Sequence, residues 1–291
     1  EFGTREEREN NPIKDMTGYG TYNQPEGTWS DDSSMVLATI ASIKDKGKID
    51  YKDIMDRFHD WCMYGEYTPF GEVFDIGIAT SRAVMKYSNG AGPLESGGKT
   101  EWDNGNGSLM RILPVCLYLF EQQKSLNISD DEVIDIVHNC SALTHAHIRS
   151  QLACGIYYFL VRAVLIKGGE LTERLQIGID DAFEYYGKNN ENELGSYNRL
   201  ILLSEFKNIP EELIKSTGYV VYTLEAAIWC LINTSSYKEA VLKAVNLGDD
   251  TDTVAAVTGG LAGLYYTYDK IPASWRAKVQ KKNWIDRLLK A

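Results

Sequence analysis

The chain has 291 residues but few cysteines and histidines, and neither type is spaced as a metal site requires. The four histidines form no zinc-binding pattern. The five cysteines lack short paired spacings, so we expect neither a disulfide framework nor a zinc site. Four of them lie among apolar residues in helix-like stretches, and an odd number of such cysteines is typical of a reducing compartment. The cysteines are Cys62, Cys116, Cys140, Cys154 and Cys230.

The sequence also lacks a hydrophobic run long enough to span a bilayer. Two of the most apolar stretches, residues 155–166 and 112–120, fall well short of the ~20 residues that a membrane helix needs, and Arg162 interrupts the first. The first five residues, EFGTR, contain no apolar signal core. We therefore expect a cytoplasmic protein with no membrane partner.

Basic residues are in the minority. Lys and Arg number 30 against 41 Asp and Glu, so the formal net charge is 30 − 41 = −11. Attraction to phosphate requires a basic face, and we therefore expect no nucleic-acid partner. The acidic balance is compatible with carboxylates that hold cations.

Alternating patterns typical of β-strands are almost absent, and residues 219–223 are the best strand-like run. Helical periodicity dominates instead. Apolar residues recur at i, i+1, i+4, i+7 and i+8 in residues 54–62, and residues 152–164 form a longer stripe. Residues 224–232 and 254–266 are apolar nearly all round, and small residues in the second would permit close helix approach. These patterns predict an all-α fold of many medium-length helices around a buried centre.

Three long loops interrupt this pattern, at residues 16–29, 88–107 and 186–198. Loops longer than ~12–15 residues in a compact domain are usually functional or disordered. The first two lead directly into the motifs described next. The third is polar and is interpreted as a surface excursion.

Acidic and hydroxyl side chains crowd the starts of two predicted helices. The segment GTWSDD (residues 27–32) precedes one apolar stripe, and GDDTDT (residues 248–253) precedes another. Helix capping explains one such cluster, but neighbouring carboxylates repel each other, and a divalent cation would remove that cost. If the fold brings the two starts together, two ions could be held by Ser30, Asp31, Asp32, Asp250, Asp252 and Thr253.

A glycine-rich turn, NGNGSLMR at residues 104–111, leads into a predicted helix at residues 112–120. Glycines before a helix start let backbone N–H groups approach an anion, and Ser108 adds a hydroxyl. No Gly-Lys-Ser/Thr follows, so this is not a Walker motif. An N-capped helix after a mobile loop is the alternative. His145 stands between two helical segments and could donate to a phosphate oxygen, although a surface or cap histidine is the commoner case.

Together these motifs resemble the ADP-ribosylglycohydrolase family, which includes the dinitrogenase-reductase-activating glycohydrolase and the ADP-ribosyl-acceptor hydrolases. The resemblance covers nearly the whole chain, and its first and last stretches are the specific ones. The matching stretches are GTWSDDSSM (residues 27–35), GNGSLMRILP (105–114), Thr144-His145, GYVVYTLEAAIW (218–229) and GDDTDTVAAVTGGLAG (248–263).

The resemblance implies an all-α fold, a compact multi-helix orthogonal bundle with a central metal cleft, as a single domain over residues 1–291. It implies a dinuclear magnesium centre, with manganese as the alternative. The implied metal ligands are Ser30, Asp31, Asp32, Asp250, Asp252 and Thr253. The implied catalytic residues are Asp31, Asp32, Asp252 and Glu1. The implied substrate-binding residues are Gly105, Asn106, Gly107, Ser108 and His145.

The chain departs from the family pattern at its start. Family members usually begin with a glycine-rich helix and a Gly-Asp-Ala-Leu-Gly-like turn before a Glu-Phe pair. The sequence here starts at that pair, Glu1-Phe2, so the usual first helix is absent from it. Glu1 would match an acidic position in a mobile flap near the metals. Asp249 stands where many members have a second glycine.

The implied activity is hydrolysis of the N- or O-glycosidic bond between ADP-ribose and an acceptor. We expect ADP-ribosyl-arginine on protein as the substrate, with a small-molecule ADP-ribose conjugate as the alternative partner. A non-catalytic ADP-ribose-binding or structural, crystallin-like relative is a second interpretation. An all-α magnesium-diphosphate enzyme such as an isoprenoid synthase is a third, but it expects acids at i, i+1 and i+4, and the position four after Asp31 is Met35.

Overall fold

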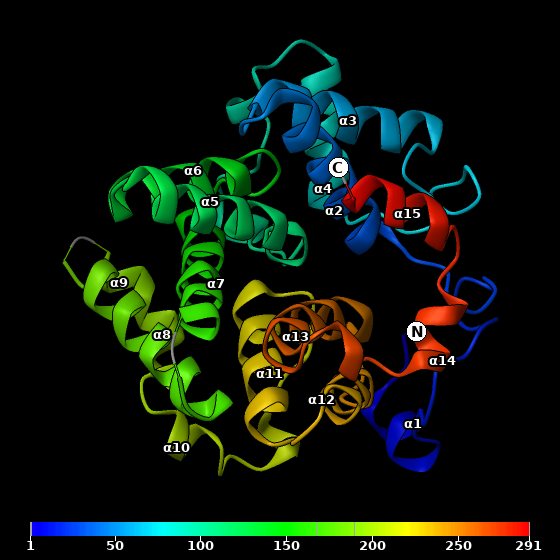
Figure 1. Ribbon diagram of the computed structural model, residues 1–291, viewed down its shortest axis with the longest axis vertical. Helices are drawn as coiled ribbons and strands as arrows, with labels where there is room; N and C mark the ends of the chain where they lie inside the picture. Colours follow the sequence, from blue (N-terminus) through cyan, green and yellow to red (C-terminus); the bar gives the residue numbers. More distant parts are fainter. Residues whose placement is uncertain (1, 167, 189, 291) are drawn as a thin grey trace.

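The computed structural model describes residues 2–166, 168–188 and 190–290, and it is built from helices (Figure 1). Those ranges contain no β-strand, only three isolated backbone bridges, so the predicted all-α fold is confirmed. The α-helices are α1 (Arg5–Asn10), α2 (Asp31–Lys46), α3 (Tyr51–Tyr64), α4 (Ile78–Ser88), α5 (Leu113–Leu126), α6 (Asp130–Ala142), α7 (Ile148–Ile166), α8 (Leu171–Tyr186), α9 (Glu191–Leu194), α10 (Leu203–Phe206), α11 (Val220–Ile232), α12 (Tyr237–Val245), α13 (Thr251–Tyr266), α14 (Ala273–Lys278) and α15 (Lys282–Leu289). Short 3₁₀ helices are η1 (Pro93–Glu95), η2 (Glu101–Asp103), η3 (Leu109–Arg111), η4 (Gly195–Leu200), η5 (Glu211–Leu213) and η6 (Tyr268–Lys270).

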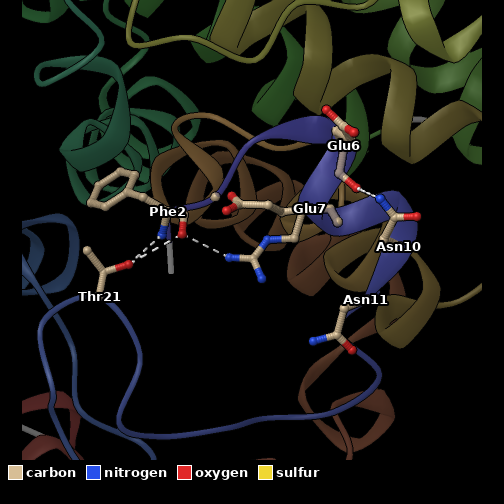
Figure 2. Close-up of a pocket in the computed structure, with 8 residues that line it drawn as sticks. Phe2, Glu6, Glu7, Asn10, Asn11 and Thr21 are labelled. Carbon is tan, nitrogen blue, oxygen red and sulfur yellow. Dashed lines mark hydrogen bonds between the residues drawn. The ribbon is translucent and has the colours of Figure 1, made fainter.

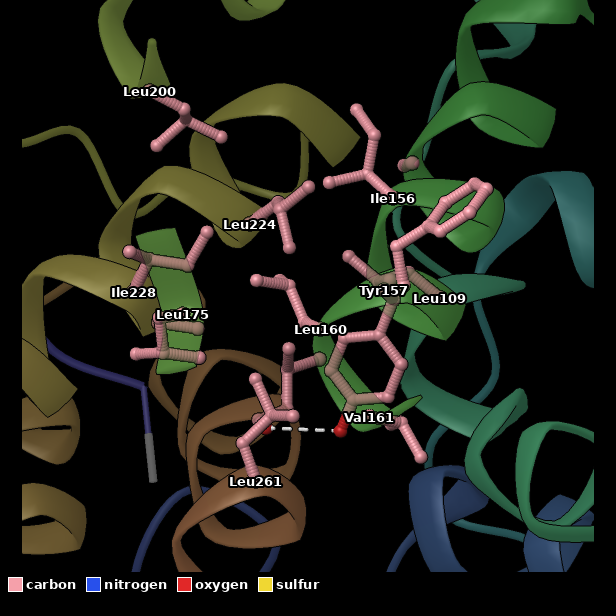
Figure 3. Close-up of a cluster of buried hydrophobic side chains, with 14 of the residues drawn as sticks. Leu109, Ile156, Tyr157, Leu160, Val161, Leu175, Leu200, Leu224, Ile228 and Leu261 are labelled. Atoms are coloured by element: carbon pink, nitrogen blue, oxygen red, sulfur yellow. Dashed lines mark hydrogen bonds between the residues drawn. The ribbon is translucent and has the colours of Figure 1, made fainter. Parts of the chain in front are cut away.

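Helix α7 is the centre of the larger hydrophobic core. Its side chains are buried on nearly every face, and it packs against α8, α11 and α13. Figure 3 shows Leu160 of α7, Leu224 of α11 and Leu261 of α13 gathered in this core. Burying one such leucine contributes roughly 1.5–3 kcal/mol relative to leaving it exposed, so this core is the main source of stability around the site.

The small residues of α13 allow the close approach that the sequence predicts. A Cβ atom at Gly260 would lie 2.6 Å from the hydroxyl of Tyr157 in α7. That hydroxyl donates to the carbonyl of Val257 at 3.2 Å, which ties the two helices together. A larger side chain at Gly260 would force α13 away from α7.

Two stretches are helical although their local sequence patterns do not indicate a helix. The strand-like run at residues 219–223 opens a helix, because α11 begins at Val220, whose N–H donates to the carbonyl of Asn104 at 3.0 Å. The preference of valine and tyrosine for strands spans only ~1 kcal/mol, and burial of α11 on nearly all sides outweighs it. The polar stretch 186–198 is no surface excursion either, since it contains α9 and part of η4 and buries Tyr197 completely.

A smaller core lies between α2, α3 and α4, with Met35, Phe58 and Val84 fully buried. Helix α2 of this core also contacts α13 of the larger one. Residues from the two ends of the chain therefore meet where the cores adjoin. In the described ranges no helix is long and apolar enough to cross a membrane.

Candidate active site

The two acidic helix starts lie together, as the sequence predicts. Asp31 and Asp32 open α2 and are 7% and 6% exposed, and Asp250 immediately precedes α13. The charges of Asp250 and Asp252 act on both carboxyl groups of α2. Segments more than two hundred residues apart in the sequence therefore form one acidic cluster.

Conventional capping does not explain this cluster. Neither Ser30 nor Asp250, which occupy the N-cap positions of α2 and α13, makes a side-chain capping hydrogen bond. Asp50 before α3 and Ser129 before α6 do make that bond. At α2 and α13 the N-cap side chains therefore do not satisfy the first backbone N–H groups of their helices in the usual way.

Burial and mutual repulsion raise the pKa values of these carboxyl groups. Burial, reinforced by Asp75 and Asp252, raises the pKa of Asp31 to about 8. Burial and the charges of Asp252 and Asp31 hold the pKa of Asp32 well above its usual range. Burial raises the pKa of Asp250 to about 7. Among the described residues no lysine or arginine is a main influence on these three groups, so the protein itself supplies no cation to balance them.

The carboxylate of Asp32 has an oxygen without a partner. Its Oδ2 accepts a hydrogen bond from Ser30 at 3.1 Å, whereas its buried Oδ1 has none within the described structure. An unpaired buried oxygen is costly, and carboxylate oxygens are the ligands that hard divalent cations prefer. The residue types thus fit a divalent cation. As the side chains of the described residues stand, however, no group of three or more His, Cys, Asp or Glu is placed so that it could hold one.

The remaining predicted residues of the acidic site are Thr253 and Glu1. Thr253 is buried in the first turn of α13 and hydrogen-bonds to Asp250. Glu1, predicted to be catalytic, lies outside the described residues.

Asp75 joins the cluster from the loop before α4, and the sequence analysis missed it. Its carboxyl group hydrogen-bonds with the Tyr22 hydroxyl and with Asp252, and burial together with the charge of Asp252 raises its pKa. The Tyr22 ring packs against Phe74 with the ring centroids 5.3 Å apart. A single aspartate in an irregular loop has no informative spacing, so only the fold identifies it.

A cavity of about 180 Å³ opens beside the acidic cluster. Ser30 and Asp252 line one part of it, and Tyr22 and Phe74 line another, so an aromatic wall adjoins the carboxylates. A separate cavity of about 570 Å³, drawn in Figure 2, lies between α1 and the loop at Thr21. None of the predicted site residues that the structure describes lines that second cavity.

The glycine-rich loop (residues 104–108) is attached to the acidic cluster through Asn106. The Asn106 side-chain amide donates to Asp250 Oδ2 at 2.8 Å and to Thr223 Oγ1 at 2.9 Å. The side chain predicted to bind substrate therefore also joins the substrate loop to the predicted metal ligands.

Three backbone N–H groups of the same loop have no acceptor among the described residues. They are those of Gly105, Gly107 and Ser108. The Ser108 hydroxyl is fully buried and accepts a hydrogen bond from Ser141 at 2.9 Å. Loop N–H groups without an acceptor could therefore bind an anion, whereas the Ser108 side chain points into the protein and contacts Ser141.

His145 lies against this loop and is 2% exposed, so it is not a surface histidine. A Cβ atom at Gly105 would lie 3.2 Å from His145 Nε2, and one at Gly107 would lie 2.8 Å from Cε1. Burial, with a smaller effect of Arg111, lowers the pKa of His145 to about 3. The ring is therefore neutral at physiological pH. Its Nδ1 is 2.9 Å from the Thr144 hydroxyl.

Comparisons with known proteins agree with this arrangement. The family model described as ADP-ribosylglycohydrolase matches residues 1–291. The chain is 32% identical to "ADP-ribosylarginine hydrolase Tri1" of Serratia proteamaculans (strain 568), covering 95% of this chain and 70% of that protein. It is 27% identical to "ADP-ribosyl-[dinitrogen reductase] glycohydrolase" of Rhodospirillum rubrum, covering 92% of this chain and 79% of that protein.

A solved structure described as "ADP-ribosylglycohydrolase-related protein complex" superposes with a TM-score of 0.74 at 29% identity, covering 95% of this chain and 85% of that one. The predicted resemblance and the predicted class of enzyme are thus confirmed, and the isoprenoid-synthase alternative is excluded. The chain belongs to the ADP-ribosylglycohydrolase family.

Proposed function

We propose that this protein hydrolyses the N-glycosidic bond between ADP-ribose and an arginine side chain of a protein. The observation that carries the proposal is a set of buried and partly buried aspartates that no described lysine or arginine balances. Through Asp250 this set hydrogen-bonds to a loop in which several backbone N–H groups have no acceptor among the described residues. The arginine acceptor is supported by the name of the Serratia relative. Residues 1–291 act as one domain, because helices from both ends of the chain build the site.

Two divalent cations, magnesium or manganese, would complete the acidic cluster. The unpaired Asp32 Oδ1 and the raised carboxyl pKa values support a cation there. When bound, such ions orient ribose hydroxyls and lower the pKa of a coordinated water. The residues that would hold them are Ser30, Asp31, Asp32, Asp250, Asp252 and Thr253.

The glycine-rich loop would bind the diphosphate of ADP-ribose. The N–H group of Gly107, which is partly exposed and has no acceptor among the described residues, suits a phosphate oxygen, and neutral His145 adds a ring N–H. Since Asn106 connects this loop to Asp250, the distance between the diphosphate and the ribose carbon that reacts is fixed by the protein. Such fixed positioning is a large part of catalysis.

Asp75 and the aromatic pair Tyr22 and Phe74 would receive the acceptor. Tyr22 and Phe74 line the cavity together with Asp252, and Asp75 hydrogen-bonds to both Tyr22 and Asp252 behind that wall. Carboxylates beside aromatic rings suit a guanidinium, which pairs with carboxylates and stacks on aromatic faces. Asp252 hydrogen-bonds with Asp75. It would therefore lie between the arginine acceptor, near Asp75, and the ribose, near the metal ligands. A carboxylate in this position can accept the proton of the attacking water as the glycosidic bond breaks.

The test is release of free ADP-ribose from a protein ADP-ribosylated on arginine. We expect release with magnesium or manganese, loss of release in excess EDTA, and recovery when the metal is restored. Serine-linked and O-acetyl-ADP-ribose substrates, run in parallel, test the acceptor assignment. No release from any of them, together with measurable ADP-ribose binding, would instead indicate a non-catalytic relative.

A further inference from the structure

Arg111, at the end of η3, is a fully buried cation without a carboxylate partner. Its side chain is 1% exposed, and no ion pair to it occurs among the described residues. The guanidinium lies over the Phe58 ring at 4.8 Å, Nη2 donates to the Cys140 carbonyl at 3.1 Å, and Nε has no partner. Arginine is costly to bury unpaired, and a hydrophobic residue of similar size fills such a space at no electrostatic cost.

A second bond of Nη2 leads toward the glycine-rich loop. Arg111 Nη2 donates to Thr144 Oγ1 at 2.8 Å, and Oγ1 is 2.9 Å from His145 Nδ1. Thr144 is fully buried, and the only acceptor recorded for its hydroxyl proton among the described residues is His145 Nδ1. Nδ1 therefore accepts, and in a neutral ring the proton is carried by Nε2.

The Nε2–H end of the ring faces the loop that carries the free amides. A Cβ at Gly105 would lie 3.2 Å from Nε2, so the ring and the loop backbone are in contact. Ser141 fixes the two parts to each other, because its hydroxyl donates to Ser108 Oγ and is also 2.9 Å from the His145 carbonyl. Arg111, Thr144 and His145 thus form a buried chain that ends beneath the loop.

We propose that Arg111 is a positioning residue that, through Thr144, holds His145 in its Nε2–H form and supplies positive potential beneath the glycine-rich loop for the diphosphate of ADP-ribose. This inference rests on the proposed function. It assigns a role to a buried charge that packing alone leaves unexplained. The negative ligand, absent from the fold itself, would balance the cation when it binds.

The decisive variant is Thr144→Val, which keeps the shape of the side chain and removes the hydroxyl. Without it, Nδ1 loses its donor, and the ring is free to carry its proton on Nδ1, where it no longer points at the loop. We expect the Kd for ADP-ribose to rise at least tenfold, and KM to rise while kcat changes less than threefold. ¹⁵N NMR of the histidines should show loss of the Nε2–H form of His145.

Two further variants separate positioning from packing. Thr144→Ser keeps the hydroxyl and should restore ADP-ribose binding and the Nε2–H signal. Thr258→Val removes another fully buried threonine hydroxyl, one that donates only to the carbonyl of Val254 within α13, and should leave both readouts unchanged. Arg111→Lys, which retains the charge without the planar fork, should bind ADP-ribose more tightly than Arg111→Met.

The result that overturns the inference is a folded Thr144→Val protein with its ADP-ribose Kd within twofold of the unchanged protein, or with the Nε2–H form of His145 intact. Failure of the unchanged protein to bind or release ADP-ribose would be a different result. It would overturn the proposed function, and this inference with it.

Discussion

The two sides of the site are opposite in charge, and among the described residues neither is balanced by an oppositely charged side chain. On the acidic side (Asp31, Asp32, Asp75, Asp250 and Asp252), burial and repulsion raise the pKa values of several carboxyl groups, and one buried oxygen has no partner. On the loop side (residues 104–108 with Arg111, Thr144 and His145), a buried guanidinium lacks a carboxylate and backbone amides lack acceptors.

The side-chain hydrogen bond that joins the two sides, from Asn106 to Asp250, comes from a neutral amide rather than from an ion pair. Buried charges without a partner are costly, and hydrophobic residues of similar size would fill the same space without that cost. Keeping the positive and negative groups apart is the arrangement that the proposed function needs, with one side for cations and the other for a diphosphate.

The largest loss of activity is expected from a substitution on the acidic side. Replacing Asp252 with Asn should lower kcat/KM for ADP-ribosyl-arginine by on the order of 10³-fold or more, because the change removes a charge at the junction of the ribose and acceptor sides. The matched control is Asp249→Asn, an exposed neighbour with φ of 59°, a conformation that asparagine tolerates. Equal activity of the two variants in an ADP-ribose release assay would contradict the assignment.

His138, a partly buried histidine away from the site, provides a test of how a protonatable group in the core affects stability as the pH changes. His138 hydrogen-bonds with Tyr186 at 2.7 Å, and burial lowers its pKa to about 4 from an ordinary 6.5. The unfolded chain takes up the proton first, so stability is fully present above pH 6.5 and is lost as the pH falls toward 4, by about 3 kcal/mol at most.

The check is denaturant unfolding at pH 7 and pH 4.5. The variant His138→Gln should lose less stability over this interval than the unchanged protein. The difference between the two proteins isolates His138 from the aspartates, whose raised pKa values act in the opposite direction on acidification. Parallel loss in both proteins would mean that His138 is not the group responsible.

Adding metal should stabilise the acidic side. At a magnesium concentration about 100 times the Kd, linkage predicts about 2.7 kcal/mol of added stability, and EDTA should remove it. In EDTA, the variant Asp32→Asn should melt at a higher temperature than the unchanged protein, because a neutral amide avoids the cost of burying a carboxylate or of protonating it on folding. Thermal melts in both conditions test this pair of expectations, and an unchanged Tm with metal would count against a cation site.

The smallest effect is expected on ADP-ribose binding, from a substitution in the backbone of the glycine-rich loop. A Cβ at Gly107 would lie 2.8 Å from His145 Cε1 and 3.0 Å from Thr80 Oγ1, so Gly107→Ala must displace the loop or the ring. We expect roughly tenfold weaker ADP-ribose binding, equivalent to about 1.4 kcal/mol. Gly195→Ala is the control, because its nearest neighbour would be the Asn198 side chain at 3.9 Å. Calorimetric titration with ADP-ribose distinguishes the two.

Much of the site was predictable because its acids cluster in the sequence. The segments at residues 27–32 and 248–253 each place several acids and hydroxyls at one helix start, and the helices they open were visible from apolar periodicity. Asp75 was not predictable, since it stands alone in a loop, and neither was the inward direction of the Ser108 side chain. Residues 219–223 have a strand-like pattern but begin a helix, because the intrinsic strand preference of valine and tyrosine is small beside the burial that α11 gains.

The sequence by itself determined the helices, the two acidic starts and the family, because periodicity and motif spelling are local properties of the chain. Only the tertiary structure decided which charges meet. It places Asp75 beside Asp252, leaves Arg111 buried without a carboxylate, and turns His145 toward the glycine-rich loop. The reason is physical: a pKa or an unpaired donor depends on burial and on distances across space, and these are fixed only when α2, α13 and the loops between them pack together.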